Sequence, residues 1–513
     1  MNTKKTLKNS ILSCGAQIAT LFLQLLNRRI FVMFLDIEFL GYHSLFTNIF
    51  LLLSVAEAGI GNIVSFHLYK EINENNKEEI GKLMCLYKWL YRLIAAVVFF
   101  MGCGCYFLLP YFVGDISVSW EFLRLIYFLQ LGGVVVGYLV SYRRTIYIVT
   151  QQEYRCMRVD LYTLIIIQTI QLITLYIHRN YIIYLILQLC ITIVSNFIIA
   201  IRAGEEYPYL RKKYLIRWED IKKRNLVSDA GNFIIHKISY AVYGGTDSIV
   251  ISAFCGIKNV ALHGSYITIQ SGVNKIINRF MNPLQAAIGT IVHGNRSKKE
   301  LWEQFEVLDI LSFFLASYLS LGFFVFFQPV IQIWLGKQYL LSEGFVIAFS
   351  INYYFVIVWE IVYRYRAVFG GYRKDRKYMI YSAILNLAVS VFLARRIGVI
   401  GVQIGTIIGY LSIAYGRIKF VIRDYFNKPL TSYLVKHSVL FITTVIEAII
   451  CYEITHDLQI DFWGLAGRAV AWMLVPLIIN VLINLRNPYF KQFIEYVKKA
   501  TYIILGKFIA LKH

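Results

Sequence analysis

Residues 27–70 read NRRIFVMFLDIEFLGYHSLFTNIFLLLSVAEAGIGNIVSFHLYK. Two adjacent arginines, Arg28 and Arg29, lie within an apolar segment; a short turn follows, and the next apolar segment carries Glu57. A weaker copy of this pattern occupies residues 254–294, with Phe254 standing 220 positions after Phe34. Ionisable residues inside a membrane are costly and usually serve a function. Their repeated occurrence therefore favours a transport pathway over a simple lipid anchor.

The composition predicts a membrane protein. Of the 513 residues, 58% are hydrophobic and only 16% are charged, and the mean hydropathy is +0.58. Many apolar runs exceed the roughly 18 residues that a helix needs to cross the hydrocarbon core. We therefore predict an all-α polytopic membrane protein with about 14 transmembrane helices. The predicted spans are residues 11–34, 41–68, 83–109, 122–142, 159–177, 181–201, 227–254, 261–292, 305–334, 341–363, 378–394, 398–416, 434–455 and 462–485.

The basic residues set the expected orientation. The formal net charge is +22, but Lys and Arg are concentrated in connections on one side of the spans rather than in a single patch. This bias predicts cytoplasmic N- and C-termini and argues against a nucleic-acid partner. The connections expected on the outer side hold only five basic residues, which are Arg179, Lys258, Lys337, Arg395 and Arg396.

The internal repeat predicts the domain organisation. His43 matches His263 at the same offset, KEEI at 77–80 matches KKEL at 298–301, and Gly102 matches Gly322. The matches stay in order over six spans, which predicts two pseudo-symmetric six-helix lobes of the same orientation around a central cavity. The expected parts are an N-terminal lobe (1–201), a basic cytoplasmic linker (202–226), a C-terminal lobe (227–421), two additional transmembrane helices (434–485) and a basic amphipathic cytoplasmic tail (486–513).

Polar residues at helical spacing mark three of the predicted spans. Gln17, Gln24 and Arg28 share one stripe, and similar stripes occur in the seventh and eighth spans. We expect these stripes to face a shared hydrophilic cavity with a net positive charge, which suits an anionic substrate because guanidinium groups bind phosphate bidentately. The candidate substrate-binding residues are Arg28, Lys275, Arg279, Arg29, Lys237, Gln17, Gln24 and Asn278.

Each candidate also has a simpler interpretation. Arg28, Arg29 and Lys237 could extend to the membrane surface instead of facing a cavity. Asp247 and Glu57 could pair with the cations or couple an ion, and His236 could be a proton carrier or an ordinary buried histidine. Four further charges lie in predicted spans without a polar stripe around them, and no role is assigned to them: Asp309, Glu360, Glu447 and Arg468.

The sequence carries no sign of an enzyme. No metalloprotease, phosphate-binding-loop or serine-hydrolase motif occurs, and Cys103 and Cys105 have the wrong spacing for a redox or zinc site. We therefore predict a non-enzymatic protein without a cofactor or metal.

Several short motifs resemble those of a known family. Leu40–Gly41, the EAGIG segment at 57–61 and the LYK segment at 68–70 resemble the N-terminal signature of Wzx-type polysaccharide flippases. TDSIVIS at 246–252 and WLG at 334–336 are similar to that family as well. The resemblance implies a transporter of the multidrug/oligosaccharidyl-lipid/polysaccharide (MOP) superfamily, located in the bacterial cytoplasmic membrane and containing two six-span lobes around a cleft.

The resemblance also implies a substrate and a mechanism. Flippases of this type move undecaprenyl-pyrophosphate-linked oligosaccharide repeat units from the inner to the outer leaflet for capsule or surface polysaccharide assembly. By analogy, the lobes would alternate access, with Arg28, Lys275 and Arg279 gripping the pyrophosphate. Asp247, Glu57 or His236 would couple H⁺ or Na⁺, and membrane lipids and polysaccharide polymerase machinery would be partners.

Two other functions fit part of the pattern. An ion-coupled drug antiporter of the same superfamily should have an acidic cavity for cationic drugs, whereas the cavity expected here is basic. A membrane polysaccharide polymerase or ligase should carry a large outer loop with catalytic residues, whereas the expected outer connections are short.

Overall fold

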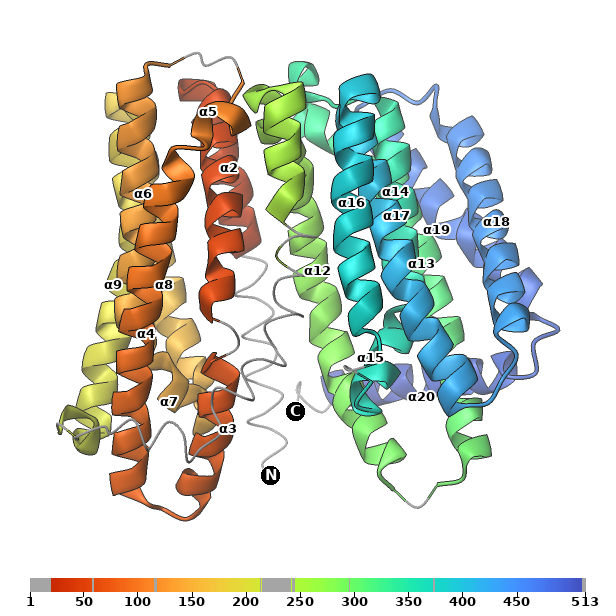
Figure 1. Cartoon of the computed structure of the whole chain (residues 1–513). Helices are drawn as coiled ribbons and strands as arrows, with labels where there is room; N and C mark the ends of the chain where they lie inside the picture. Colours follow the sequence, from red (N-terminus) through yellow and green to blue (C-terminus); the bar gives the residue numbers. More distant parts are fainter. Residues whose placement is uncertain are drawn as a thin grey trace. The chain divides into compact units, whose positions relative to one another are not determined.

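A computed structural model of the chain describes residues 20–57, 60–114, 118–212, 214, 241, 245–294, 296–371 and 374–509. Every regular element within these ranges is a helix, which confirms the predicted all-α fold class (Figure 1). The chain divides into two compact units, residues 1–275 and 276–513, called unit 1 and unit 2 below. The boundary lies within one long helix, α12 (Ile257–Val292).

Among the described residues, ten helical segments are long and apolar enough to cross a membrane, so the chain is a multi-pass membrane protein. They are α4 (Lys77–Tyr106), α6 (Trp120–Ser141), α8 (Glu153–His178), α9 (Tyr181–Glu206), α13 (Lys298–Trp334), Glu343–Val368, α16 (Arg376–Ile397), Val399–Tyr425, α18 (Leu430–Thr455) and α19 (Phe462–Asn484). The predicted spans 11–34, 41–68, 227–254 and 261–292 are not among the ten, and the first and third extend beyond the described residues. The count of 14 therefore stays a prediction.

Unit 1 is a bundle of long helices with short elements at its ends. α4 contacts α6, α6 contacts α9, and α8 contacts α9 (Figure 1). The short elements are α5 (Leu109–Phe112), α7 (Arg144–Val149) and η2 (Pro208–Arg211). A helix over residues 20–34, α2 (Glu38–Leu53), the helix Gly245–Cys255 and the first half of α12 complete the described part of the unit.

The second predicted span is interrupted rather than continuous. α2 ends at Leu53, the 3₁₀-helix η1 covers Ser54–Glu57, and α3 covers Ile60–Asn73. The prediction of one uninterrupted helix over 41–68 was therefore wrong. The described part of the interruption is the 3₁₀-helix over Ser54–Glu57, directly before the two residues that the structure does not describe. Glu57 turns toward α4, where its carboxylate accepts a hydrogen bond of 2.8 Å from the Tyr91 hydroxyl.

Two glycines allow α12 to approach its neighbours closely in unit 1. A Cβ atom on Gly41, at the start of α2, would lie 2.3 Å from the carbonyl oxygen of Ile257. A Cβ atom on Gly272 would lie 2.7 Å from a methyl carbon of Leu21. A larger side chain at either position would force the helices apart. The Leu40–Gly41 motif thus has a packing role at the start of α12.

The helices follow the same order twice along the chain. α4, α6, the short α7, α8 and α9 are matched in order by α13, α14 (Glu343–Val358), the short α15 (Glu360–Val368), α16 and α17 (Val399–Ile418). Both short helices fall where the sequence repeat pairs SYRR at 141–144 with VYRY at 362–365. This order supports the internal repeat, while the lobe boundaries and the relation of the two copies in space stay predictions.

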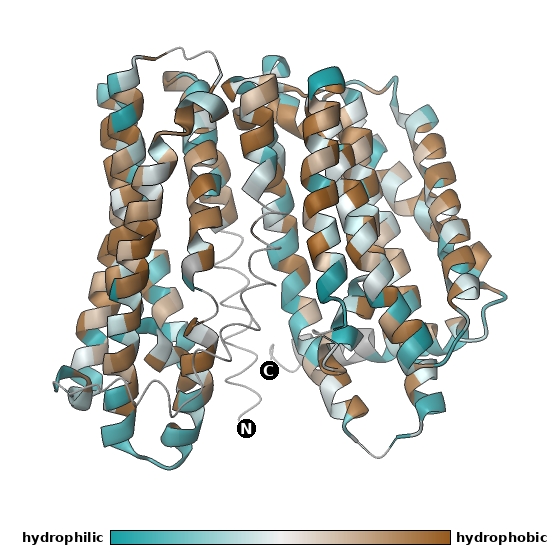
Figure 2. Ribbon diagram, viewed as in Figure 1, coloured by the Kyte–Doolittle hydropathy of each residue, from teal (hydrophilic) through white to brown (hydrophobic). Residues whose placement is uncertain are grey.

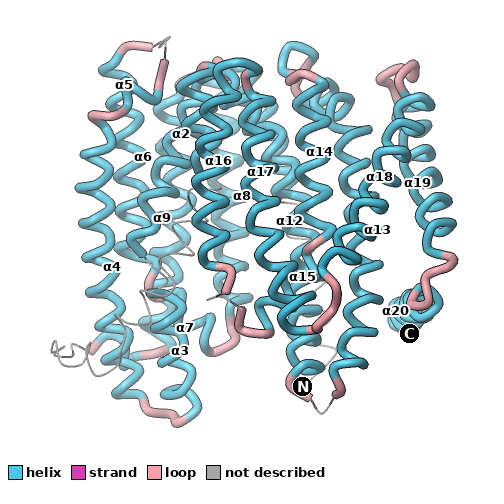
Figure 3. Tube along the Cα trace, turned by 45° about the vertical axis from the view of Figure 1, so that its right-hand side comes forward, coloured by secondary structure: helices cyan, strands magenta, loops and turns pink. Residues whose placement is uncertain are grey.

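Unit 2 contains a second bundle and a transverse helix. α13 begins with a capping box, in which Ser297 and Glu300 satisfy each other's backbone N–H groups. α13 contacts α14, α18 and α19, and α16 packs along α17, which continues into the π-helix η4 (Lys419–Tyr425). α20 (Phe490–Ile509) lies across the bundle, and its Phe493 ring is 5.3 Å from that of Phe314 (Figures 1 and 3).

Hydropathy differs between the helices. Figure 2 shows hydrophobic residues over much of α4 and α6, and hydrophilic residues near many helix ends. α12 differs, because hydrophilic residues also occur along its middle. This segment contains three of the predicted site residues, Lys275, Asn278 and Arg279.

Candidate functional site: a cationic cavity in unit 1

Unit 1 contains a polar cavity of about 330 Å³. Its walls come from the helix over residues 20–34, α2, α8, α9 and α12. The lining residues are Gln24, Asn27, Arg28, Leu40, His43, Gln168, Tyr181, Tyr184, Gln188, Ile267, Thr268 and Ser271. Two predicted site residues, Gln24 and Arg28, therefore lie at the same cavity.

Arg28 is held against α12. Its Nε donates to Ser265 Oγ at 3.1 Å, and its Nη2 donates to the carbonyl oxygen of Ala261 at 2.8 Å. A guanidinium group has five N–H donors. The two hydrogen bonds therefore fix the direction of the side chain, and among the described residues no hydrogen bond is made by its three other N–H groups. The interpretation of Arg28 as a residue that extends to the membrane surface does not agree with this anchored position.

Small residues on α12 make room for the guanidinium group. A Cβ atom on Gly264 would lie 3.3 Å from Nη2 of Arg28 and 3.3 Å from Oγ of Ser44. Ala261 and Ser265 flank this glycine and provide the two acceptors. The ALHGS segment at 261–265 thus provides the surface of α12 against which the Arg28 guanidinium group packs.

A network of neutral hydrogen bonds supports the cavity wall beside Arg28. Asn27, which is 4% exposed, donates to Gln171 at 2.8 Å and accepts from the Tyr184 hydroxyl at 2.7 Å. Gln171 in turn donates to Gln188 at 3.2 Å. The helix over residues 20–34 is therefore fixed to α8 and α9 next to the arginine.

Arg28 differs from three other arginines that lie among packed helices. In α7, Arg144 pairs with Asp160, and in unit 2 Arg364 and Arg366 pair with Glu360 and Asp375. Within the described ranges, Arg28 bonds only to neutral oxygens, and no carboxylate lines its cavity. No described carboxylate neutralises its charge there, and a half-buried cation of this kind favours an anionic partner.

The other predicted substrate-binding residues are placed as follows. Arg29 is exposed, and so is Lys275 at the end of unit 1. In unit 2, Arg279 is half-buried, and Asn278 accepts a hydrogen bond of 3.4 Å from Arg364. Gln17 and Lys237 lie outside the described residues, as does His236, which was considered for ion coupling.

The two remaining ion-coupling candidates have different surroundings. Asp247 is half-buried on the helix Gly245–Cys255. Glu57 ends a relay of hydroxyl groups, in which Tyr87 donates to Tyr91 at 2.8 Å and Tyr91 donates to Glu57 at 2.8 Å. A role of either carboxylate in ion coupling stays a prediction.

The sequence analysis missed a polar cluster around Arg364 in unit 2. Its guanidinium group donates to Glu360 at 2.8 Å, to Asn282 at 3.1 Å and to Gln285 at 2.7 Å. The contacts fasten the short helix α15 to the second half of α12. The sequence signal for this cluster is the arginine in the VYRY segment at 362–365, directly after the apolar predicted span 341–363.

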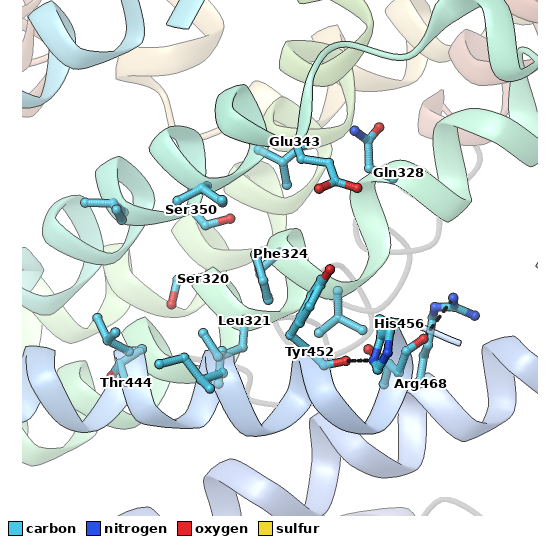
Figure 4. Close-up of a pocket in the computed structure, with 18 of the residues that line it drawn as sticks. Ser320, Leu321, Phe324, Gln328, Glu343, Ser350, Thr444, Tyr452, His456 and Arg468 are labelled. Atoms are coloured by element: carbon cyan, nitrogen blue, oxygen red, sulfur yellow. Dashed lines mark hydrogen bonds between the residues drawn. The ribbon is translucent and has the colours of Figure 1, made fainter. Parts of the chain in front are cut away.

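Unit 2 also contains a larger cavity of about 780 Å³ between α13, α14 and α18. Its middle is apolar and includes Leu321 and Phe324, while Gln328, Glu343 and His456 lie toward the ends of these helices (Figure 4). Elsewhere in unit 2, Asp309 is 1% exposed and accepts hydrogen bonds from Lys436 Nζ at 2.8 Å and from the Tyr433 hydroxyl at 2.9 Å.

No family model matches the sequence, and no curated protein matches it either. Several solved structures are similar in fold. The lipid II flippase MurJ, in an inward closed conformation, has a TM-score of 0.70 at 16% identity, over 92% of this chain and 99% of MurJ. An inward-facing multidrug-resistance MATE family transporter of the MOP superfamily has a TM-score of 0.58 at 13% identity, over 80% of this chain and 98% of that one.

A MATE protein in complex with MaL6 is also similar, with a TM-score of 0.52 at 14% identity over 81% of this chain and 96% of that one. The chain thus has the fold of MurJ and the MATE transporters, which are a flippase and transporters rather than enzymes. At these identities the likeness defines the fold alone.

Proposed function

We propose that this protein is a flippase for a lipid-linked oligosaccharide whose carrier bears a pyrophosphate, of the undecaprenyl-pyrophosphate class. The observation that carries the proposal is the unit 1 cavity, where neutral groups anchor Arg28 and the described residues leave three of its N–H donors available to an anion. The fold shared with the lipid II flippase MurJ supports it. The Wzx-type resemblance of residues 27–70 supplies the substrate class.

The cavity offers both kinds of contact that such a headgroup needs. Arg28 provides a planar, charged donor for phosphate oxygens. Gln24, Gln188 and Thr268 provide neutral donors and acceptors of the kind that bind sugar hydroxyl groups. A cationic drug would meet the charge of Arg28 and no carboxylate among the lining residues, so the cavity favours the flippase over a drug antiporter.

We further propose that the pyrophosphate is passed between leaflets by alternating access, with Lys275 and Arg279 on α12 as additional cationic contacts. The product would be repeat units at the outer leaflet for capsule or other surface polysaccharide. Polysaccharide polymerase machinery would then use them. In this proposal both chain termini are cytoplasmic, as the distribution of Lys and Arg predicts.

The test is translocation of a lipid-linked oligosaccharide in proteoliposomes by the wild type, Arg28→Ala, Arg28→Lys and Arg29→Ala. A hydrogen bond to a charged group contributes about 1.5–3 kcal/mol, so Arg28→Ala should slow translocation by about tenfold to a hundredfold. Arg28→Lys keeps the positive charge but loses the planar, bidentate guanidinium group, so its translocation rate should lie between those of the wild type and Arg28→Ala. The exposed neighbour Arg29 is the matched control and should stay near wild type. Full activity in Arg28→Ala would refute the proposal.

A further inference from the structure

Glu447 is a buried carboxyl group that the cavity of unit 1 does not use. It lies on α18, is 0% exposed, and accepts a hydrogen bond of 2.6 Å from the Ser317 hydroxyl of α13 through Oε2. The same hydroxyl oxygen accepts a hydrogen bond of 3.0 Å from Asn480 Nδ2 of α19. Glu447 thus lies where three helices of unit 2 meet.

Two oxygens at this junction lack a hydrogen-bond donor. Among the residues that the structure describes, neither Glu447 Oε1 nor Asn480 Oδ1 has a hydrogen-bond partner, although both side chains are fully buried. Both side chains bind the same Ser317 hydroxyl, so their free oxygens belong to one small cluster. Two buried acceptors without a donor are costly. A single proton on the carboxyl group would supply the missing donor.

No cation near Glu447 replaces that proton in the described part of the chain. The titratable groups that interact electrostatically with it include Tyr318 on α13, Tyr354 on α14 and Cys451 on α18. All three are neutral in their ordinary protonation states at neutral pH. On α19, Arg468 stands twelve residues before Asn480, which is about 18 Å along the helix. An isolated carboxylate in such surroundings normally becomes neutral by taking a proton.

The unit 2 cavity provides a route for the proton. Thr444 and Ala448, on either side of Glu447 along α18, line the cavity, and so does Ser320, one turn after Ser317 on α13. Figure 4 shows Ser320 and Thr444 at one part of the cavity and His456 at another, near the end of α18. The Ser320 hydroxyl donates to the Ser317 carbonyl at 3.1 Å, so the cavity wall directly adjoins the junction.

We propose that Glu447 is a proton-binding site that links the two helices after the repeat, α18 and α19, to α13. The carboxylate takes one proton from water that enters through the unit 2 cavity, forming a neutral carboxylic acid that donates to Asn480. Loss of the proton leaves a charge that must be hydrated, which loosens the contact between the three helices. That this step drives transport rests on the proposed flippase function; the proton site itself does not.

The direct test is infrared difference spectroscopy of the full-length protein between acidic and alkaline pH. The wild type should show the carbonyl band of a protonated carboxylic acid that disappears at alkaline pH. Glu447→Gln should lose this band, and Glu495→Gln, which removes an exposed carboxylate on α20, should keep it. Glu447→Asp keeps a carboxyl group and should shift the band. A shifted band in this variant keeps the assignment testable if Glu447→Gln fails to fold. Asn480→Ala should shift it as well.

An unchanged band in Glu447→Gln would overturn the proton site, and so would a carboxylate that responds to sodium but never shows a protonated band. A second measurement separates this inference from the flippase proposal. With a pH gradient imposed across proteoliposomes, the wild-type translocation rate should change with the gradient, whereas Glu447→Gln should keep a gradient-independent rate. A protonated band without any translocation would leave the site standing and refute the flippase. Translocation without the protonated band would support the flippase proposal and overturn the proton site.

Discussion

Replacing Arg364 by alanine should destabilise unit 2 strongly. The side chain of Arg364 is 7% exposed, and it joins α15 to α12 through Asn282 and Gln285 while pairing with Glu360. The variant leaves the Glu360 carboxylate, whose side chain is 18% exposed, without its charged partner. Breaking a buried pair in this way typically costs about 3–5 kcal/mol.

Two further variants test how much of this loss of stability comes from leaving Glu360 without Arg364. Because Glu360→Ala together with Arg364→Ala removes both charges, the double variant should lose less stability than Arg364→Ala alone. Arg396→Ala is the control, because Arg396 is exposed and only packs over the Phe392 ring at 4.5 Å. It should cost less than about 1 kcal/mol.

The assay is thermal unfolding of the purified protein in detergent, with α15 followed by hydrogen exchange. Arg364→Ala should unfold at a lower temperature than the control and the double variant, and exchange in α15 should rise. Equal unfolding temperatures for Arg364→Ala and Arg396→Ala would refute the reasoning, because they would show that the cluster does not hold α15 in place.

Three further predictions concern packing and hydrogen bonding. Gly41→Val should lower the unfolding temperature, because the new side chain would clash with the Ile257 carbonyl oxygen. The control is Gly132→Val, because a Cβ atom at Gly132 would have no neighbour within 4 Å, and it should leave the unfolding temperature unchanged. Equal effects of the two substitutions would contradict the close approach at Gly41. Asn27→Ala should cost about 1–3 kcal/mol by leaving buried partners unsatisfied, and a chemical unfolding curve that matches wild type would count against the network. Arg468→Ala should speed hydrogen exchange over residues 455–461, because its guanidinium group donates hydrogen bonds to the carbonyl oxygens of Thr455, Leu458 and Gln459 at and after the end of α18. Unchanged exchange there would contradict this role.

The sequence allowed the helical class and part of the cavity to be predicted. Apolar runs long enough for a membrane revealed most of the helices, and the spacing of Gln24 and Arg28 placed both on one face, where the structure puts them at one cavity. The rest of the wall could not be found in this way. Tyr184 reaches Asn27 from 157 positions away, and such a contact leaves no local periodicity.

Other features lacked a local signal for the same reason. Arg364 meets acceptors 79–86 positions away, and Glu447 meets Ser317 from 130 positions away. Contacts between residues so far apart in the chain leave no local periodicity from which they could be predicted. The change from α2 to the 3₁₀-helix Ser54–Glu57 also lacked a signal, because hydropathy alone favoured one continuous helix over 41–68.

The central claim is that the unit 1 cavity accepts an anionic headgroup through Arg28. Equilibrium binding of two lipids to the purified protein tests it directly: an isoprenoid carrier with a pyrophosphate and the same carrier as its uncharged alcohol. The wild type should prefer the pyrophosphate by at least about tenfold, as expected for one charged hydrogen bond. Arg28→Ala should lose that preference and Arg29→Ala should keep it. An equal preference in wild type and Arg28→Ala would contradict the claim.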